Sequence, residues 1–349
     1  MSAVVETVLG AVESSSLGVV LPHEHVFFDL RARFCAPTGF GCGTGLEPVS
    51  LANIGRIRYA QRMNLDNLHL NDVADAIAEF ESFKALGGGA IVDLSPASNG
   101  RSIEKLRKVS EATGVGVIVG TGYYVDQFLT EEMDASRIDA LAGRMVGELT
   151  DGVDDTGVRA GIIGEVGCSW PLTERERVSL AASAIAQQQT GAAISIHPGR
   201  AAAAPAEIVS VLVAAGADPG RVVIGHLDRT FDSVDQVLAL ADCGVYLEFD
   251  LFGQESSHIT YGDIELPSDM RRLRMISEVV RRGFGDKVLL SHDIALKHHL
   301  ETYGGHGYAH LLRRVVPRMP EVGLAEDQID RMLRGNPAQV LTRTGRRGQ

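Results

Sequence analysis

Cysteines are few in this 349-residue sequence, and no two of them are closely paired. Cys35, Cys42, Cys168 and Cys243 form no Cys-x-x-Cys motif. Scattered thiols in a chain without an export signal are more typical of reduced packing residues than of a disulfide framework, although Cys35 and Cys42 could be bridged. We therefore expect the cysteines to be reduced.

Long apolar runs are missing as well. No stretch approaches the ~20 residues of a membrane-spanning helix. Residues 1–18 include Glu6 and Glu13 but no basic residue, which makes this segment a poor signal peptide. These absences favour a cytoplasmic protein with no membrane partner.

Basic residues are outnumbered by acidic ones. The 33 Lys and Arg against 45 Asp and Glu give a formal net charge of −12. Such a balance argues against nucleic acid or an anionic membrane as the main partner. We expect a small-molecule substrate. The hydrophobic fraction of 45% is enough for a substantial core.

Short apolar, β-branched runs recur along the whole chain. There are eight, at residues 19–21, 90–94, 115–120, 161–165, 192–197, 222–226, 245–249 and 288–291. Their near-continuous hydrophobicity is typical of parallel strands covered on both faces. Amphipathic segments at 72–86, 102–113, 174–190 and 205–215 lie between them, each followed by a glycine that would end a helix.

Eight strand–helix units in a chain of this length predict a (β/α)₈ TIM barrel, forming one domain over residues 1–349. Two long segments, at about 31–71 and 250–270, follow the first and seventh strands. Because segments that follow strands lie at the catalytic face of such a barrel, we expect both to cover an active site.

A histidine pair closes the first predicted strand, in Leu21-Pro22-His23-Glu24-His25. Side chains alternate along a strand, so His23 and His25 point to one side and Glu24 points away. Two imidazoles at a strand end can bind one metal ion. A single His-x-His is weak evidence, because it arises easily by chance.

Other predicted strands end in further ligand types. These are Glu165 after the fourth strand, His197 after the fifth, His226 after the sixth and Asp293 after the eighth. In a barrel the carboxyl ends of all strands meet at one mouth. Any one of these residues could be a hydrogen-bonded core residue. Burying such a side chain without a partner costs several kcal/mol of folding free energy. Because six of them would gather at one place, we predict that they bind metal.

The same residues carry a family resemblance. The sequence resembles the phosphotriesterase family of the amidohydrolase superfamily, with similarity over nearly the whole chain. The resembling segments are Leu21–His25, Ile162–Gly167, Ile196–Arg200, Ile224–Asp228, Leu290–Asp293, Gly304–Tyr308 and Gly335–Ala338.

The resemblance implies a metal centre with two divalent ions. His23 and His25 would bind the more buried ion together with Asp293, and His197 and His226 the more exposed one. Glu165 stands where the best-known members have a carbamylated lysine, as in the phosphotriesterase-related subgroup. Zn²⁺ is the default for a histidine-rich site, with Mn²⁺, Co²⁺ or Fe²⁺ as alternatives. A homodimer is also implied.

The residues predict a metal-dependent hydrolase. A hydroxide between the two ions would attack a carboxylic ester or lactone of a small metabolite, with Asp293 as general base. An N-acyl amino acid-type amidase and a phosphotriesterase are alternatives on the same centre. A mononuclear, deaminase-like enzyme is a mechanistic alternative, and a non-catalytic, metal-stabilised binding protein is an alternative of another class.

Substrate contacts are harder to predict. Arg200 could bind an anionic substrate group, or it could be a surface arginine that opens a helix. Tyr123 or Tyr124 could donate to a substrate carbonyl, with simple packing as the alternative. Asp228 could hold a ligand histidine or lie exposed in a loop. We expect His298, His299, His306 and His310 to be helix-surface or packing residues.

Overall fold

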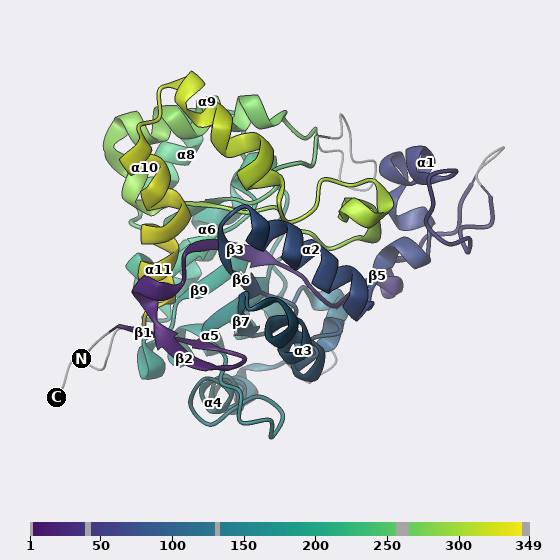
Figure 1. Ribbon diagram of the computed structural model, residues 1–349. Coiled ribbons are helices and arrows are strands. Elements are labelled where there is room, and N and C mark those ends of the chain that lie inside the picture. Colours follow the sequence, from purple (N-terminus) through teal and green to yellow (C-terminus); the bar gives the residue numbers. More distant parts are fainter. Residues whose placement is uncertain (1–2, 39–42, 130–132, 256–264, 344–349) are drawn as a thin grey trace.

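Eight parallel strands form the centre of the computed structural model (Figure 1), which describes residues 3–38, 43–129, 133–255 and 265–343. The hydrogen-bonded order is β12-β11-β10-β9-β8-β7-β6-β3. The strands are β3 (Val19–Glu24), β6 (Gly88–Asp93), β7 (Gly116–Thr121), β8 (Ile162–Gly167), β9 (Ile194–His197), β10 (Val222–Ile224), β11 (Tyr246–Phe249) and β12 (Val288–Leu290). All eight predicted strands are present, which confirms the (β/α)₈ barrel.

The barrel is closed between its first and last strands by Glu24. One carboxylate oxygen of Glu24 accepts hydrogen bonds from Ser291 Oγ (2.8 Å) and the His292 backbone N–H (3.0 Å), and the other accepts from the Ile294 N–H (2.9 Å). Backbone bonds from Asp293 N to His23 O and from His25 N to Ile294 O complete this seam. Glu24 points away from the histidine pair, as the strand alternation predicts.

Helices cover the outside of the barrel (Figure 1). They are α2 (Val73–Ala85), α3 (Ile103–Thr113), α4 (Ile138–Thr150), α5 (Glu174–Thr190), α6 (Ala204–Ala214), α8 (Val234–Ala241), α9 (Asp269–Val279), α10 (Glu326–Asp330) and α11 (Asn336–Leu341). The four predicted helices begin and end within one residue of their expected bounds. Gly114 and Gly191 end α3 and α5 at φ of 68° and 69°, a left-handed conformation that glycine adopts without a steric penalty.

The barrel interior is a packed apolar core. One cluster of buried side chains takes a residue from or beside every strand, from Val20 on β3 to Leu289 on β12, so these side chains point inward. Val5 of an N-terminal hairpin, β1 (Val4–Thr7) and β2 (Gly10–Glu13), joins this cluster together with Val340 of α11. The hairpin was not predicted. Side chains therefore fill the interior of the barrel.

The segment after β3 is long and mostly irregular. It contains the short strands β4 (Phe28–Asp29) and β5 (His69–Leu70) and the short helix α1 (Ile54–Tyr59). The second predicted covering segment falls partly on residues 256–264, which lie outside the described residues, as does Cys42. In the described ranges, no helix is long and apolar enough to cross a membrane.

Candidate metal centre

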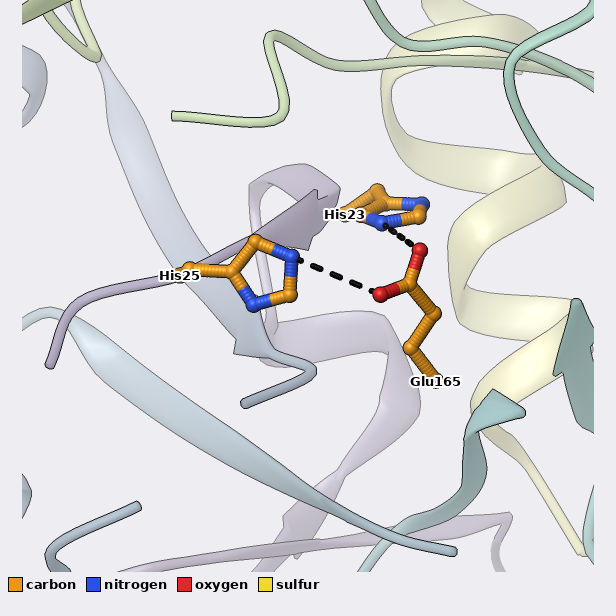
Figure 2. Close-up of side chains that lie close together, drawn as sticks. All are labelled: His23, His25 and Glu165. Carbon is orange, nitrogen blue, oxygen red and sulfur yellow. Dashed lines mark ion pairs between the residues drawn. The ribbon is translucent and has the colours of Figure 1, made fainter. Parts of the chain in front are cut away.

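The six predicted ligands come together at the carboxyl ends of the strands. Glu165 of β8 is at the centre of the group. Its Oε1 lies 2.8 Å from His197 Nδ1, 3.1 Å from His226 Nε2 and 3.2 Å from His23 Nε2. Its Oε2 faces His25 Nε2 at 3.7 Å. Figure 2 shows Glu165 directed between the two histidines of the His-x-His motif.

Two sets of donor atoms share this one carboxylate. His23, His25 and Glu165 form one set, and Glu165, His197 and His226 form the other, with the donor atoms of each set within 4.8 Å of one another. Asp293 lies beside the first set, with Oδ1 3.3 Å from His25 Nε2. This arrangement is suited to two neighbouring cations bridged by Glu165.

Partners behind the imidazoles fix their orientation. His23 Nδ1 lies 2.9 Å from Glu248 Oε2 and 3.1 Å from Asp250 Oδ2, and His226 Nδ1 lies 2.8 Å from Asp250 Oδ1. If each Nδ1 carries the proton and donates to these carboxylates, the Nε2 lone pairs of His23 and His226 face the centre.

Glu248 and Asp250 were missed in the sequence. Glu248 lies on β11, inside a run that attracted attention only for its hydrophobicity, and Asp250 directly follows that strand. Two carboxylates with strand spacing in a buried run would have been the signal, because a buried strand rarely contains acidic residues without partners.

The centre carries an excess of buried negative charge. Glu165, Glu248, Asp250 and Asp293 approach one another around the histidines, and in the part of the chain that the structure describes only imidazoles form ion pairs with them. His23 Nε2 and Glu165 Oε2 are buried without a hydrogen-bond partner. Four carboxylates and neutral imidazoles fit two divalent cations in both charge and donor type.

The pKa values follow from this charge distribution. Burial opposes the charged form of His226, but the Asp250 carboxylate raises its pKa to about 9. The pKa of His23 is raised well above its ordinary value by Asp250 and Glu248, again against burial. Burial raises the pKa of Glu248 to about 7. Without metal, protons thus compensate the carboxylates, and metal binding would release them.

Two of the ligands have a left-handed backbone. His226 has φ of 55° and Asp293 has φ of 52°, and only Asp154 and Asp155 share a positive φ among the described non-glycine residues. Such a conformation costs ~1 kcal/mol or more and persists where surrounding contacts impose it. The His226 N–H donates to Asp250 at 2.9 Å, so one carboxylate holds both its backbone and its ring.

A cavity of about 340 Å³ opens onto the centre. His25, His197 and Asp293 form part of its wall. Arg200 and Tyr124 lie where the sequence predicted them, on this cavity, together with Cys168, Trp170, Arg33, Arg62 and Arg229. The wall thus combines ligand side chains with four arginines.

Tyr123 is placed elsewhere. It lines a separate cavity of about 220 Å³ with Arg101 and Glu148, because consecutive residues after β7 face opposite sides. The structure therefore gives no support to Tyr123 as a substrate contact, and of the two tyrosines only Tyr124 lies at the centre.

Comparison with known proteins identifies the family. The model of the phosphotriesterase family matches residues 3–341. The chain belongs to this family. The phosphotriesterase-family chain is 42% identical to human N-acetyltaurine hydrolase over 98% of its own length and 99% of that protein. The predicted resemblance is confirmed.

Solved structures with the same fold support this family assignment. A resiniferatoxin-binding protein from Rhodobacter sphaeroides superposes with a TM-score of 0.93 and 33% identity, covering 97% of this chain and 95% of that one. The phosphotriesterase homology protein of Escherichia coli, complexed with phosphate in its active site, has a TM-score of 0.77 and 30% identity over 94% and 99% of the two chains. The chain is thus a hydrolase of a family that depends on two metal ions.

Several other polar residues are more buried than the sequence indicated. Asp228 is not exposed in a loop but accepts hydrogen bonds from Arg272 Nε (2.7 Å) and the Leu251 N–H (3.1 Å). His299 is buried and lines the cavity. The centroids of the His299 and His306 rings are 5.3 Å apart. These histidines pack against one another, in line with the packing role predicted for them.

Proposed function

We propose that this phosphotriesterase-family hydrolase cleaves the amide bond of small, anionic N-acyl compounds of the N-acetyltaurine type. The observation that carries this proposal is a single cavity that joins the carboxylate–imidazole centre to Arg33, Arg62, Arg200 and Arg229. Four guanidinium groups on one cavity wall offer donors that suit an acidic substrate, in spite of the negative net charge of the chain. The 42% identity to N-acetyltaurine hydrolase supports the same substrate class.

Residues for two metal ions are present. His23, His25 and Asp293 would hold one ion, His197 and His226 the other, and Glu165 would lie between them. The ions would supply an activated water molecule and polarise the scissile carbonyl oxygen. We propose Zn²⁺ as the metal, with Mn²⁺, Co²⁺ or Fe²⁺ as alternatives.

Asp293 is the proposed general base. Its side chain is 20% exposed, more than any other carboxylate of the centre, and it lines the cavity. Burial alone would raise its pKa, but the hydrogen bond with His25 and the nearby imidazoles lower it, so the carboxylate stays ionised at neutral pH. Asp293 would take the proton of the attacking water and pass it to the leaving amine, which must be protonated to depart.

Ester or lactone hydrolysis is the second candidate. It is favoured by the apolar part of the cavity wall, where Phe28, Leu30 and Trp170 could contact an acyl chain or a lactone ring. The same centre would polarise an ester carbonyl, so the two candidates differ in the substrate and not in the machinery.

A substrate panel separates them. Metal-loaded protein is tested with N-acetyltaurine, an uncharged N-alkyl acetamide of equal length, N-acetyl amino acids, aliphatic lactones, aryl esters and an aryl phosphotriester. We expect kcat/KM for N-acetyltaurine to exceed that for an uncharged amide of equal length by about 100-fold, as expected for a buried charge contact. Lactone turnover above amide turnover would overturn the proposal in favour of the second candidate. Metal analysis in parallel distinguishes two ions per chain from one.

A further inference from the structure

The short helix α7 (Leu227–Thr230) directs two neighbouring charges to opposite sides. Asp228 points back to Arg272, whereas Arg229 points to the cavity at the metal centre. Arg229 Nη2 lies 3.3 Å from His197 Nε2 and donates to the Pro198 carbonyl at 3.1 Å. Its other terminal nitrogen, Nη1, is buried and has no hydrogen-bond partner.

Arg229 has fewer partners than other enclosed arginines. Arg221 also lacks a carboxylate, but it donates to four backbone carbonyls. Arg101 lies 2.8 Å from Glu148, and Arg272 contacts both Asp228 and Asp269. No carboxylate of the described residues lies within 4.0 Å of the Arg229 guanidinium. A guanidinium group enclosed without a carboxylate in direct contact is costly, because the carboxylates of the centre act on it only from a longer distance.

The surroundings of Arg229 favour a bound anion. Burial and the positive charge of Arg200 both oppose the charged form of Arg229, and the more distant Asp250 and Asp293 carboxylates only partly offset them, so that its pKa is lowered to about 10. Two like charges are therefore held near each other on one cavity wall. An oxyanion between or beside them would remove both the repulsion and the unsatisfied donor.

We infer that Arg229 binds the acidic group of the substrate through Nη1 and thereby determines the preference for anionic acyl compounds. This inference rests on the proposed function. Because Arg229 contacts His197, an anion held at Nη1 lies close to the centre, as expected for an acidic group two carbons from the scissile amide. A sulfonate and a carboxylate present the same oxyanion chemistry to the guanidinium.

The test compares Arg229→Met and Arg229→Lys on charged and uncharged substrates. With N-acetyltaurine, we expect KM to rise about 10- to 100-fold in Arg229→Met, the usual effect of losing a hydrogen bond to a charged group, and less in Arg229→Lys. With the neutral ester p-nitrophenyl acetate, the loss of kcat/KM in the same variant should be at least tenfold smaller than the loss with N-acetyltaurine. Arg177→Met, which removes an arginine paired with Glu207 on the outside of the barrel, is the matched control for net charge.

A second measurement does not depend on amide hydrolysis. Ethanesulfonate and propionate are tested as inhibitors of p-nitrophenyl acetate turnover, in wild type and in both variants. A competitive inhibition constant that rises at least tenfold in Arg229→Met supports the inference even if N-acetyltaurine is not hydrolysed, and the better inhibitor shows whether sulfonate or carboxylate is preferred. Unchanged inhibition overturns it. Equal losses on the neutral and anionic substrates, with intact metal content and thermal midpoint, would also overturn it, because Arg229 would then only position His197.

Discussion

Asp250 is expected to be more important for metal binding than its place behind the ligands suggests. Its Oδ1 accepts from His226 Nδ1 at 2.8 Å and its Oδ2 lies 3.1 Å from His23 Nδ1, so one carboxylate orients a ligand of each predicted ion. In Asp250→Asn the amide NH₂ faces one of these N–H groups, donor against donor. One ring must then flip its tautomer and present N–H to the metal.

The expected loss of metal affinity in Asp250→Asn depends on how many ligand imidazoles lose their partner. Losing the partner of one ligand histidine typically weakens metal affinity by about 10- to 100-fold. In Asp250→Asn one ring meets the NH₂ group, and the other keeps only a neutral amide oxygen in place of the carboxylate. Because both rings are affected, we expect a loss of about 100-fold, which corresponds to ~2.7 kcal/mol. Glu248→Gln should lose less, since Glu248 contacts only His23.

Chelator-competition titration followed by metal analysis measures this difference. Asp228→Asn is the matched control, because Asp228 is equally buried but pairs with Arg272 and not with an imidazole. That variant should be less stable while its folded form keeps its metal affinity. If Asp250→Asn binds two ions within about threefold of the wild-type affinity, the orienting role argued from these distances is wrong.

Further predictions concern catalysis, pH and stability. Asp293→Asn should lower kcat by about 10²- to 10⁴-fold, measured by steady-state kinetics at matched metal content, and a retained kcat would exclude it as the base. The pKa of His226 rises from 6.5 to about 9 on folding without metal, so its stabilising contribution is present below pH 6.5 and is lost as the pH rises through 9. Urea unfolding of chelated protein at pH 6, 8 and 10 should show this fall, and a rise in stability over that range would contradict it. Arg272→Met leaves the Asp228 carboxylate buried without its ion-pair partner. We expect the free energy of unfolding, measured with urea, to fall by ~3–5 kcal/mol, and a fall of less than ~1 kcal/mol would contradict this.

Local patterns in the sequence were sufficient for most of the barrel. Apolar runs and the glycines that follow helices mark element ends because they depend on neighbouring residues alone, and Gly114 and Gly191 end their helices as predicted. The N-terminal hairpin was missed because its strands are only four residues long and include Glu6 and Glu13. Short, partly polar strands gain their stability from packing that the sequence does not display.

The candidate ligands were found because a barrel brings all strand ends to one place. The contacts around them were not, since they depend on how each loop turns after its strand. Asp228 and Arg229 are adjacent in sequence, but α7 directs one to Arg272 and the other to the cavity. No pattern in the sequence distinguishes these two directions, nor does it separate Tyr123 from Tyr124.

Glu24 links the formation of the metal centre to the closure of the barrel. It joins residues on both sides of Asp293 to the strand that carries His23, and the residues in this contact are 267–270 positions apart in the chain. The six ligands can assemble only when the last strand has docked on the first. Metal that binds only the closed barrel would stabilise it against unfolding. Metal occupancy could therefore report complete folding in variants or shortened chains.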